Sequence, residues 1–189
     1  HLSQHRPEAV ADADIERLTF VNNHSTAENK ERLYKTSLER ITKTYSSTSA
    51  SSQAIYLLAE WYASKGVTYD PLKDTTFRLA YITAKELCEK GLFQKEPGEG
   101  RSNCVNLLNQ ITKKQLKTQI EKVNLPGEPF RILVTYKNIP AAYFRIIKVD
   151  PDLKDKLGRE TWTDEYWQKL TLLPAIGQFS SDLPATGDY

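Results

Sequence analysis

Two cysteines, Cys88 and Cys104, are the residues of this chain whose chemistry is easiest to define. Their spacing matches no zinc-binding or redox motif. Two interpretations remain open: the thiols form a buried pair, or they form a disulfide that ties the end of one helix to the next element and implies an oxidising compartment. Cys88 and Cys104 are therefore the candidate disulfide of this chain.

Histidine could supply a general base or a metal ligand, but His1, His5 and His24 all lie near the start of the chain. A histidine-activated nucleophile or a histidine-rich metal site needs these rings beside residues from later elements. The terminus would have to fold back to bring them there. We therefore predict no catalytic residue, no metal ligand and no cofactor.

Carboxylate pairs such as Glu96 with Glu99, or Asp164 with Glu165, could hydrolyse a glycoside at the correct separation. Charged loop residues are, however, usually solvated. The segment EPGEGRSN, residues 96–103, precedes a predicted helix and could hold a phosphate at the helix N-terminus. It lacks the P-loop lysine and the dinucleotide-site spacing, so we interpret it as a loop between helices. The sequence favours a protein that is not an enzyme.

Aromatic side chains offer a binding chemistry instead. Trp162, Tyr166 and Trp167 lie near the end of the chain, and Tyr69 lies in a predicted loop. Exposed rings could stack on sugar rings, whereas buried rings would pack in the core. These four residues are the candidate ligand-stacking aromatics. They support an alternative function, a helical-repeat, carbohydrate-binding surface lipoprotein.

The composition is that of an ordinary folded protein. Hydrophobic residues make up 39% of the 189 residues and charged residues 26%, which argues against wholesale disorder. A net charge of +2 gives no electrostatic case for nucleic acid or an anionic membrane. No apolar run approaches the roughly 20 residues of a membrane span. The chain begins at His1 and contains no Met, so we expect a mature form or a piece of a longer chain.

Apolar residues recur at steps of three and four in the first part of the chain, which predicts amphipathic helices. The expected helices cover residues 26–45, 50–65, 72–90 and 102–111, after a weaker segment at 15–21. Equivalent points recur after about one tetratricopeptide unit, roughly 34 residues of helix-turn-helix. We therefore expect a tetratricopeptide-like helical hairpin stack over residues 1–113, with a different helical arrangement as the alternative. Stacked helices of this kind typically form binding surfaces.

The apolar period falls to two after residue 113, which predicts strands. Strand-like runs cover residues 116–123, 131–136 and 143–149, with a turn at Pro126-Gly127. We expect the last two runs to form a β-hairpin across Asn138-Ile139-Pro140. Both faces of this hairpin carry apolar residues, so we expect it to be covered on both sides, in a sandwich or beneath the helices. Residues 150–159 are expected to form a polar loop.

The segments SNCVNLLNQI (102–111) and PGEPFRILVTYKNIPAAYFRIIKVD (126–150) carry a resemblance to a known family. Together with LTLLPAIGQFSSDLPATGDY (170–189), they resemble the N-terminal part of bacterial alpha-2-macroglobulin-family proteins, particularly the large ones of Bacteroidetes. The resemblance implies a helical repeat segment that leads into the first macroglobulin-like β-sandwich. The thioester sequence of the family, Cys-Gly-Glu-Gln, is absent, so any protease trapping would reside in another part of the protein.

These observations define an α+β chain in two parts. We expect residues 1–113 to form the helical stack and residues 114–189 to form an antiparallel β region, which the resemblance implies is an incomplete macroglobulin-like β-sandwich. From the resemblance we expect a noncatalytic structural or protein-interaction module of a larger exported protein, in the periplasm or at the cell surface. Its expected partners are other domains of the same longer chain and a protease, with no nucleic acid and no membrane span.

Overall fold

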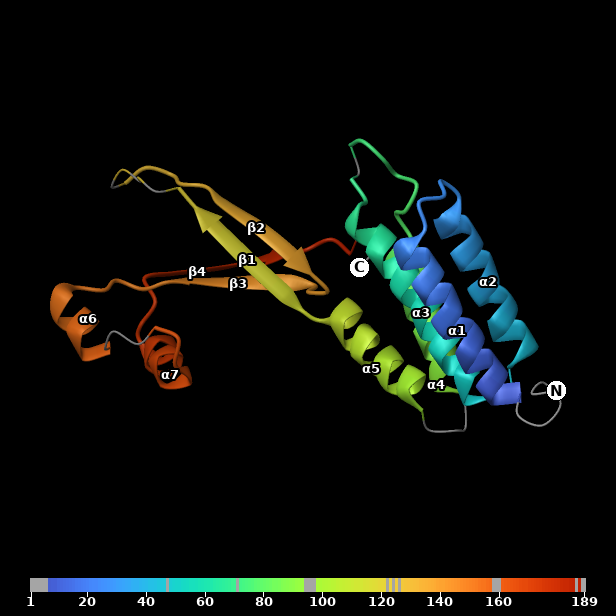
Figure 1. Cartoon of the computed structure of the whole chain (residues 1–189). Coiled ribbons are helices and arrows are strands. Elements are labelled where there is room, and N and C mark those ends of the chain that lie inside the picture. Colours follow the sequence, from blue (N-terminus) through green and yellow to red (C-terminus); the bar gives the residue numbers. More distant parts are fainter. Residues whose placement is uncertain are drawn as a thin grey trace. The chain divides into compact units, whose positions relative to one another are not determined.

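The computed structural model describes residues 7–46, 48–70, 72–93, 98–121, 123, 125, 127–157, 161–185 and 187. These residues form seven helices and two antiparallel sheets of two strands each, so the chain is mixed α+β (Figure 1). Its contacts divide the chain after Lys114 into two compact units. The helical unit lies before this point, and the β unit covers Gln115–Ala185.

Five helices make up the described part of the helical unit (Figure 1). They are α1 (Pro7–His24), α2 (Lys30–Thr44), α3 (Ser49–Val67), α4 (Ala80–Leu92) and α5 (Glu99–Thr112). The central helix, α3, contacts all four of the others. Its buried alanines, including Ala54, Ala59 and Ala63, leave room for these neighbours to approach closely.

The hydrophobic core of the helical unit has two clusters, one on each side of α3. The first joins α1, α2 and α3 around Leu38, Ile41 and Leu58. The second joins α3, α4 and α5 around Ile55, Cys88, Cys104, Leu107 and Ile111. Because α3 contributes to both clusters, it is apolar around most of its circumference, as a buried helix must be.

Two helix boundaries differ from the sequence prediction. The weak segment at 15–21 is part of a full helix, α1, and α4 begins at Ala80, later than the predicted residue 72. The backbone N–H of Leu72 donates to Asp70 Oδ1, and that of Thr76 donates to Asp74 Oδ1; each N–O distance is 2.9 Å. Aspartates that accept such local hydrogen bonds stabilise turns in place of helix, so α4 begins only at Ala80.

The β unit contains β1 (Gln115–Ile120), β2 (Ile132–Lys137), β3 (Ala141–Ile146) and β4 (Gly177–Asp182). Strand β1 pairs with β2 from Gln115↔Lys137 to Ile120↔Ile132. Strand β3 pairs with β4 from Ala141↔Asp182 to Ile146↔Gly177. The turn predicted at Pro126-Gly127 lies partly outside the described residues; Gly127 itself has φ = 84°, in the left-handed region that favours glycine.

The predicted hairpin between the second and third strand-like runs is wrong. Asn138, with φ = 55°, and Pro140 join β2 to β3, but each of these strands pairs with a different partner. The alternating pattern predicts that a segment is a strand, whereas the choice of partner depends on competition between all possible pairings. The prediction paired the second run with the third because they are close in the chain, and this proximity did not determine the pairing.

The predicted polar loop at 150–159 is also wrong, because it contains α6 (Pro151–Leu157), and α7 (Asp164–Leu172) follows before β4 (Figure 1). Local residues explain both helices. Asp150 Oδ1 accepts a hydrogen bond from the Leu153 N–H, and proline occupies the first helical position. Thr163 Oγ1 accepts a bond from the Tyr166 N–H and caps α7.

Candidate functional site

The paired strands of the β unit each form a two-stranded ribbon with one apolar face. Directly paired residues of antiparallel strands share a face. The register therefore places Leu116, Ile120, Ile132, Val134 and Tyr136 on one face of the β1–β2 ribbon. In the second ribbon, β3–β4, it places Ala142, Phe144, Ile146 and Phe179 on one face, where the Phe144 and Phe179 rings stack with centroids 4.8 Å apart.

These apolar faces are only partly covered. Among the described residues of the β unit, Ala142 and Leu157 are the buried hydrophobic side chains. On these faces Leu116, Ile120, Ile146 and Phe179 are exposed, whereas Ile132, Val134, Tyr136 and Phe144 are half-buried. Leu133 and Tyr143, which lie on the opposite faces, are exposed as well. The described part of the unit therefore covers the apolar faces only in part and does not cover the strands on both sides.

Each ribbon also has open edges. Within the described residues, every strand of the β unit has one neighbouring strand. Two further hydrogen bonds extend the pairing of β3 with β4. The Ile176 N–H donates to Ile146 O and the Leu183 N–H donates to Pro140 O, each with an N–O distance of 2.8 Å. A strand with one neighbour presents backbone N–H and C=O groups on its other edge, and such an edge can accept another strand.

Three of the four candidate aromatics lie in the β unit. Trp162 is 76% exposed and Trp167 is 54% exposed, while Tyr166 is half-buried. The rings of Tyr166 and Trp167 meet edge to face, 5.8 Å between centroids. Tyr69 belongs to the helical unit, where it follows α3 and is half-buried. The structure thus brings Tyr166 and Trp167 together and leaves Trp162 accessible to solvent.

The candidate disulfide residues lie in the helical unit as free, fully buried thiols on α4 and α5. The pKa of Cys88 is raised, first by its hydrogen bond with Cys104 and then by burial. The same hydrogen bond lowers the pKa of Cys104. The two side chains therefore contact each other, and their oxidation stays a prediction.

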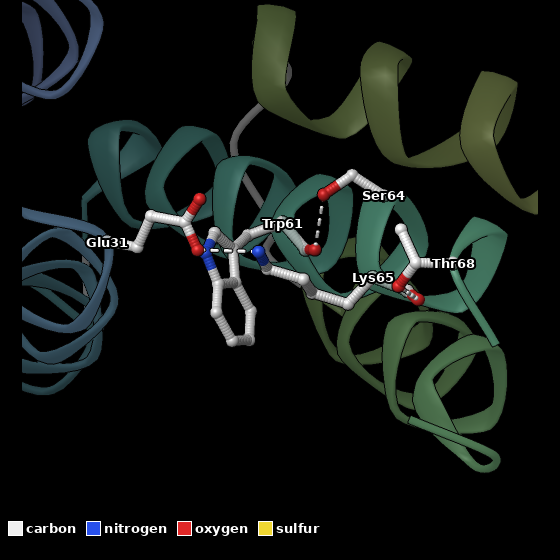
Figure 2. A network of polar contacts seen from close by, with 5 residues as sticks. All are labelled: Glu31, Trp61, Ser64, Lys65 and Thr68. Carbon is white, nitrogen blue, oxygen red and sulfur yellow. Dashed lines mark hydrogen bonds and ion pairs between the residues drawn. The ribbon is translucent and has the colours of Figure 1, made fainter. Parts of the chain in front are cut away.

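A polar and aromatic cluster between α2 and α3 has no counterpart in the sequence prediction. Lys65 Nζ lies 2.5 Å from Glu31 Oε2 and 5.6 Å from the Trp61 ring centroid. Figure 2 shows the Lys65 side chain passing the Trp61 ring toward Glu31. Lys35 Nζ lies 5.4 Å from the same centroid. Cation–π and ionic contacts of this kind tie adjacent helices together, so we assign the cluster a stabilising role.

A cleft of about 390 Å³ lies between α1 and the starts of α3 and α5. Asp12, Glu16 and Glu99 line it, together with Gln53, whose Oε1 is buried without a hydrogen-bond partner in the described structure. This is where the segment 96–103 begins its helix, and the surrounding carboxylates make the site unfavourable for the phosphate considered from the sequence. Glu96, the other acid of that segment, lies outside the described residues.

Within the described ranges, the remaining candidate acids and bases have local partners. Glu165 is ion-paired with Lys169 at 2.7 Å, and the hydrogen bond between them lowers the pKa of Glu165, opposite to the change that a general acid needs. His24 Nδ1 lies 2.8 Å from Phe20 O, and His1 and His5 lie outside the described residues. In the part of the chain that the structure describes, no three His, Cys, Asp or Glu residues are grouped to hold a metal ion.

Comparison with protein-family models, with curated proteins and with solved structures finds no match to this chain. Of the helices in the described ranges, none combines the length and apolar character that crossing a membrane requires.

Proposed function

We propose that this chain is a noncatalytic protein-interaction module and that its β unit is completed by strands from other domains of a larger protein. The observation that carries the proposal is the combination of open strand edges with partly exposed apolar faces in the described part of the β unit. An isolated two-stranded ribbon is only marginally stable in water. An added strand would satisfy the edge hydrogen bonds, and a second sheet would cover the apolar face.

The resemblance to alpha-2-macroglobulin-family proteins makes this proposal more specific. In the specific version, the two ribbons belong to a macroglobulin-like sandwich, and the helical unit is a tetratricopeptide-like stack that precedes this sandwich in the chain. The larger protein is then exported, at the cell envelope, and its protease-trapping activity as an endopeptidase inhibitor depends on domains other than this one. The ribbons supply strands for assembly, and the helices supply a surface for contact with neighbouring domains.

Hydrogen exchange tests this proposal by comparing the 189-residue chain with the protein isolated from its natural source, which the proposal predicts to be longer. We expect residues 132–146 to exchange rapidly in the short chain and to become strongly protected in the longer protein. Equal and strong protection in both, with the short chain a monomer, would overturn the proposal.

Two neighbouring substitutions sharpen the experiment. Ile120→Asp places a charge on the apolar face of the β1–β2 ribbon, whereas Gln119→Asp places the same charge on the opposite face. In the longer protein, Ile120→Asp should reduce the protection of β2, and Gln119→Asp should leave it nearly unchanged. Equal effects of the two substitutions would argue against burial of the apolar face beneath a second sheet.

The exposure of Trp162 and Trp167 favours a second candidate, a carbohydrate-binding surface lipoprotein. Exposed indole rings are available for stacking on sugars. A panel of oligosaccharides should quench or shift the tryptophan fluorescence if this function is correct. The response should disappear in Trp162→Ala, while Trp61→Phe in the helical unit should retain it.

A further inference from the structure

The thiols of Cys88 and Cys104 meet inside the helical unit. Each residue is 0% exposed, and both belong to the cluster that α3, α4 and α5 form around Ala59 and Ile111. Most buried cysteines pack against aliphatic side chains as small hydrophobic residues. Here, in contrast, the two cysteines share one cluster, and the interaction between their thiols raises the pKa of Cys88 and lowers the pKa of Cys104.

The backbone of α4 is shaped to receive Cys104. Gly91 follows Cys88 by three residues, so the two lie on the same face of α4. A Cβ atom at Gly91 would lie only 2.8 Å from Cys104 Sγ and 3.3 Å from Ile55 Cγ2. The absence of a side chain at Gly91 therefore allows α5 to approach α4 at the turn beside Cys88.

We propose that Cys88 and Cys104 are oxidised to an intramolecular disulfide that fastens α5 to α4, and that this bond closes only while α5 is detached from the core. The second part follows from burial. An oxidant in solution cannot reach either sulfur in the folded unit, because both side chains are fully covered. Opening of α5, or the unfolded chain before folding, exposes both.

The reaction is a thiol–disulfide exchange with a small-molecule disulfide such as oxidised glutathione. The thiolate of one cysteine attacks a glutathione sulfur, which forms a mixed disulfide and releases one glutathione thiolate. The thiolate of the second cysteine then attacks the protein sulfur of the mixed disulfide and releases the other glutathione. Two protein S–H bonds are lost, one S–S bond forms, and two glutathione thiols carry away the two protons and two electrons.

This inference concerns the helical unit and does not depend on the function proposed for the β unit.

Oxidative refolding provides the test. The reduced, urea-unfolded chain is diluted into buffer with reduced and oxidised glutathione, alkylated, and mapped by mass spectrometry without reduction. We expect a Cys88–Cys104 peptide pair and a helical-unit Tm about 5–15 °C above that of the reduced protein, because the bond restricts the unfolded chain. The folded, reduced protein should react much more slowly, and low urea concentrations should accelerate it.

Variants separate oxidation from folding defects. In the double variant Cys88→Ala/Cys104→Ala, the Tm should not respond to the redox state of the buffer. In Cys88→Ser and in Cys104→Ser, the remaining cysteine should keep glutathione as a mixed disulfide, because no second protein thiol is present to displace it. Two free thiols after oxidative refolding, or stable glutathione adducts on the wild-type chain, would overturn the proposal.

Discussion

The carboxylates of Glu8, Asp12 and Glu16 are spaced four residues apart on α1, so they lie along one face of the helix. The pKa of Asp12 is raised above its ordinary value of 3.8, by partial burial first and then by the two neighbouring glutamates. A raised carboxyl pKa in the folded state means that ionisation of Asp12 opposes folding. The stability available below pH 3.8 is therefore lost as the pH rises through the folded-state pKa.

Asp12→Asn should accordingly stabilise the helical unit at pH 7 and have little effect at pH 3. Each like-charge pair at this spacing costs about 0.2–0.5 kcal/mol, and the substitution removes two such pairs. Thermal unfolding followed by circular dichroism at both pH values measures the difference. Asp14→Asn is the matched control, because Asp14 is ion-paired with Arg17 at 3.0 Å and gains nothing from neutralisation. A gain of equal size at pH 3 would contradict the electrostatic explanation.

At the scale of elements, the contact between α3 and α5 depends on a glycine. A Cβ atom at Gly100 would lie 2.2 Å from the Gln53 backbone nitrogen, closer than any tolerated contact. The clash involves backbone, so rotation of a side chain cannot relieve it. At Gly98 a Cβ atom would lie 3.6 Å from Ser49 Cβ, an ordinary contact, and the backbone there is extended.

Gly100→Ala should therefore destabilise the helical unit by about 1–3 kcal/mol or more, the typical cost of overpacking a core. Gly98→Ala, two residues earlier, should cost no more than about 1 kcal/mol, because its Cβ atom meets no clash and the loss is that of a poorer N-cap. Urea unfolding of the two variants, with the midpoint read from helical circular dichroism, makes the comparison. Similar midpoints for both variants would show that α5 does not lie as close to α3 as described.

At the scale of the whole molecule, the two units differ in how much core they contain. Both hydrophobic clusters are formed by helices α1 to α5. In the β unit, the described buried hydrophobic residues are Ala142 and Leu157. Burial of apolar surface is the main favourable contribution to folding, so the helical unit has the larger independent stability.

A fragment of residues 1–114 should remain helical and unfold cooperatively on heating. A fragment of residues 115–185 should associate or aggregate, because its strand edges are open and its apolar faces are only partly buried. Light scattering after size-exclusion chromatography and thermal circular dichroism examine both fragments. A monomeric 115–185 fragment with a cooperative transition would contradict this expectation and would also weaken the proposed function.

The sequence by itself determined most elements of the helical unit and the positions of β1, β2 and β3. Helical spacing and alternation are properties of neighbouring residues, so they can be read without knowledge of the fold. The local caps at Asp150 and Thr163 were also present in the sequence, and with attention to them α6 and α7 could have been predicted.

Only the tertiary structure decided which strands pair, which aromatic rings are exposed, and which acids meet in the cleft beside Gln53. It also brought Cys88 against Cys104, where the sequence had left two interpretations open. These outcomes depend on contacts between residues far apart in the chain. Several arrangements share the same local pattern, and the folded one is selected by the small difference in free energy among them.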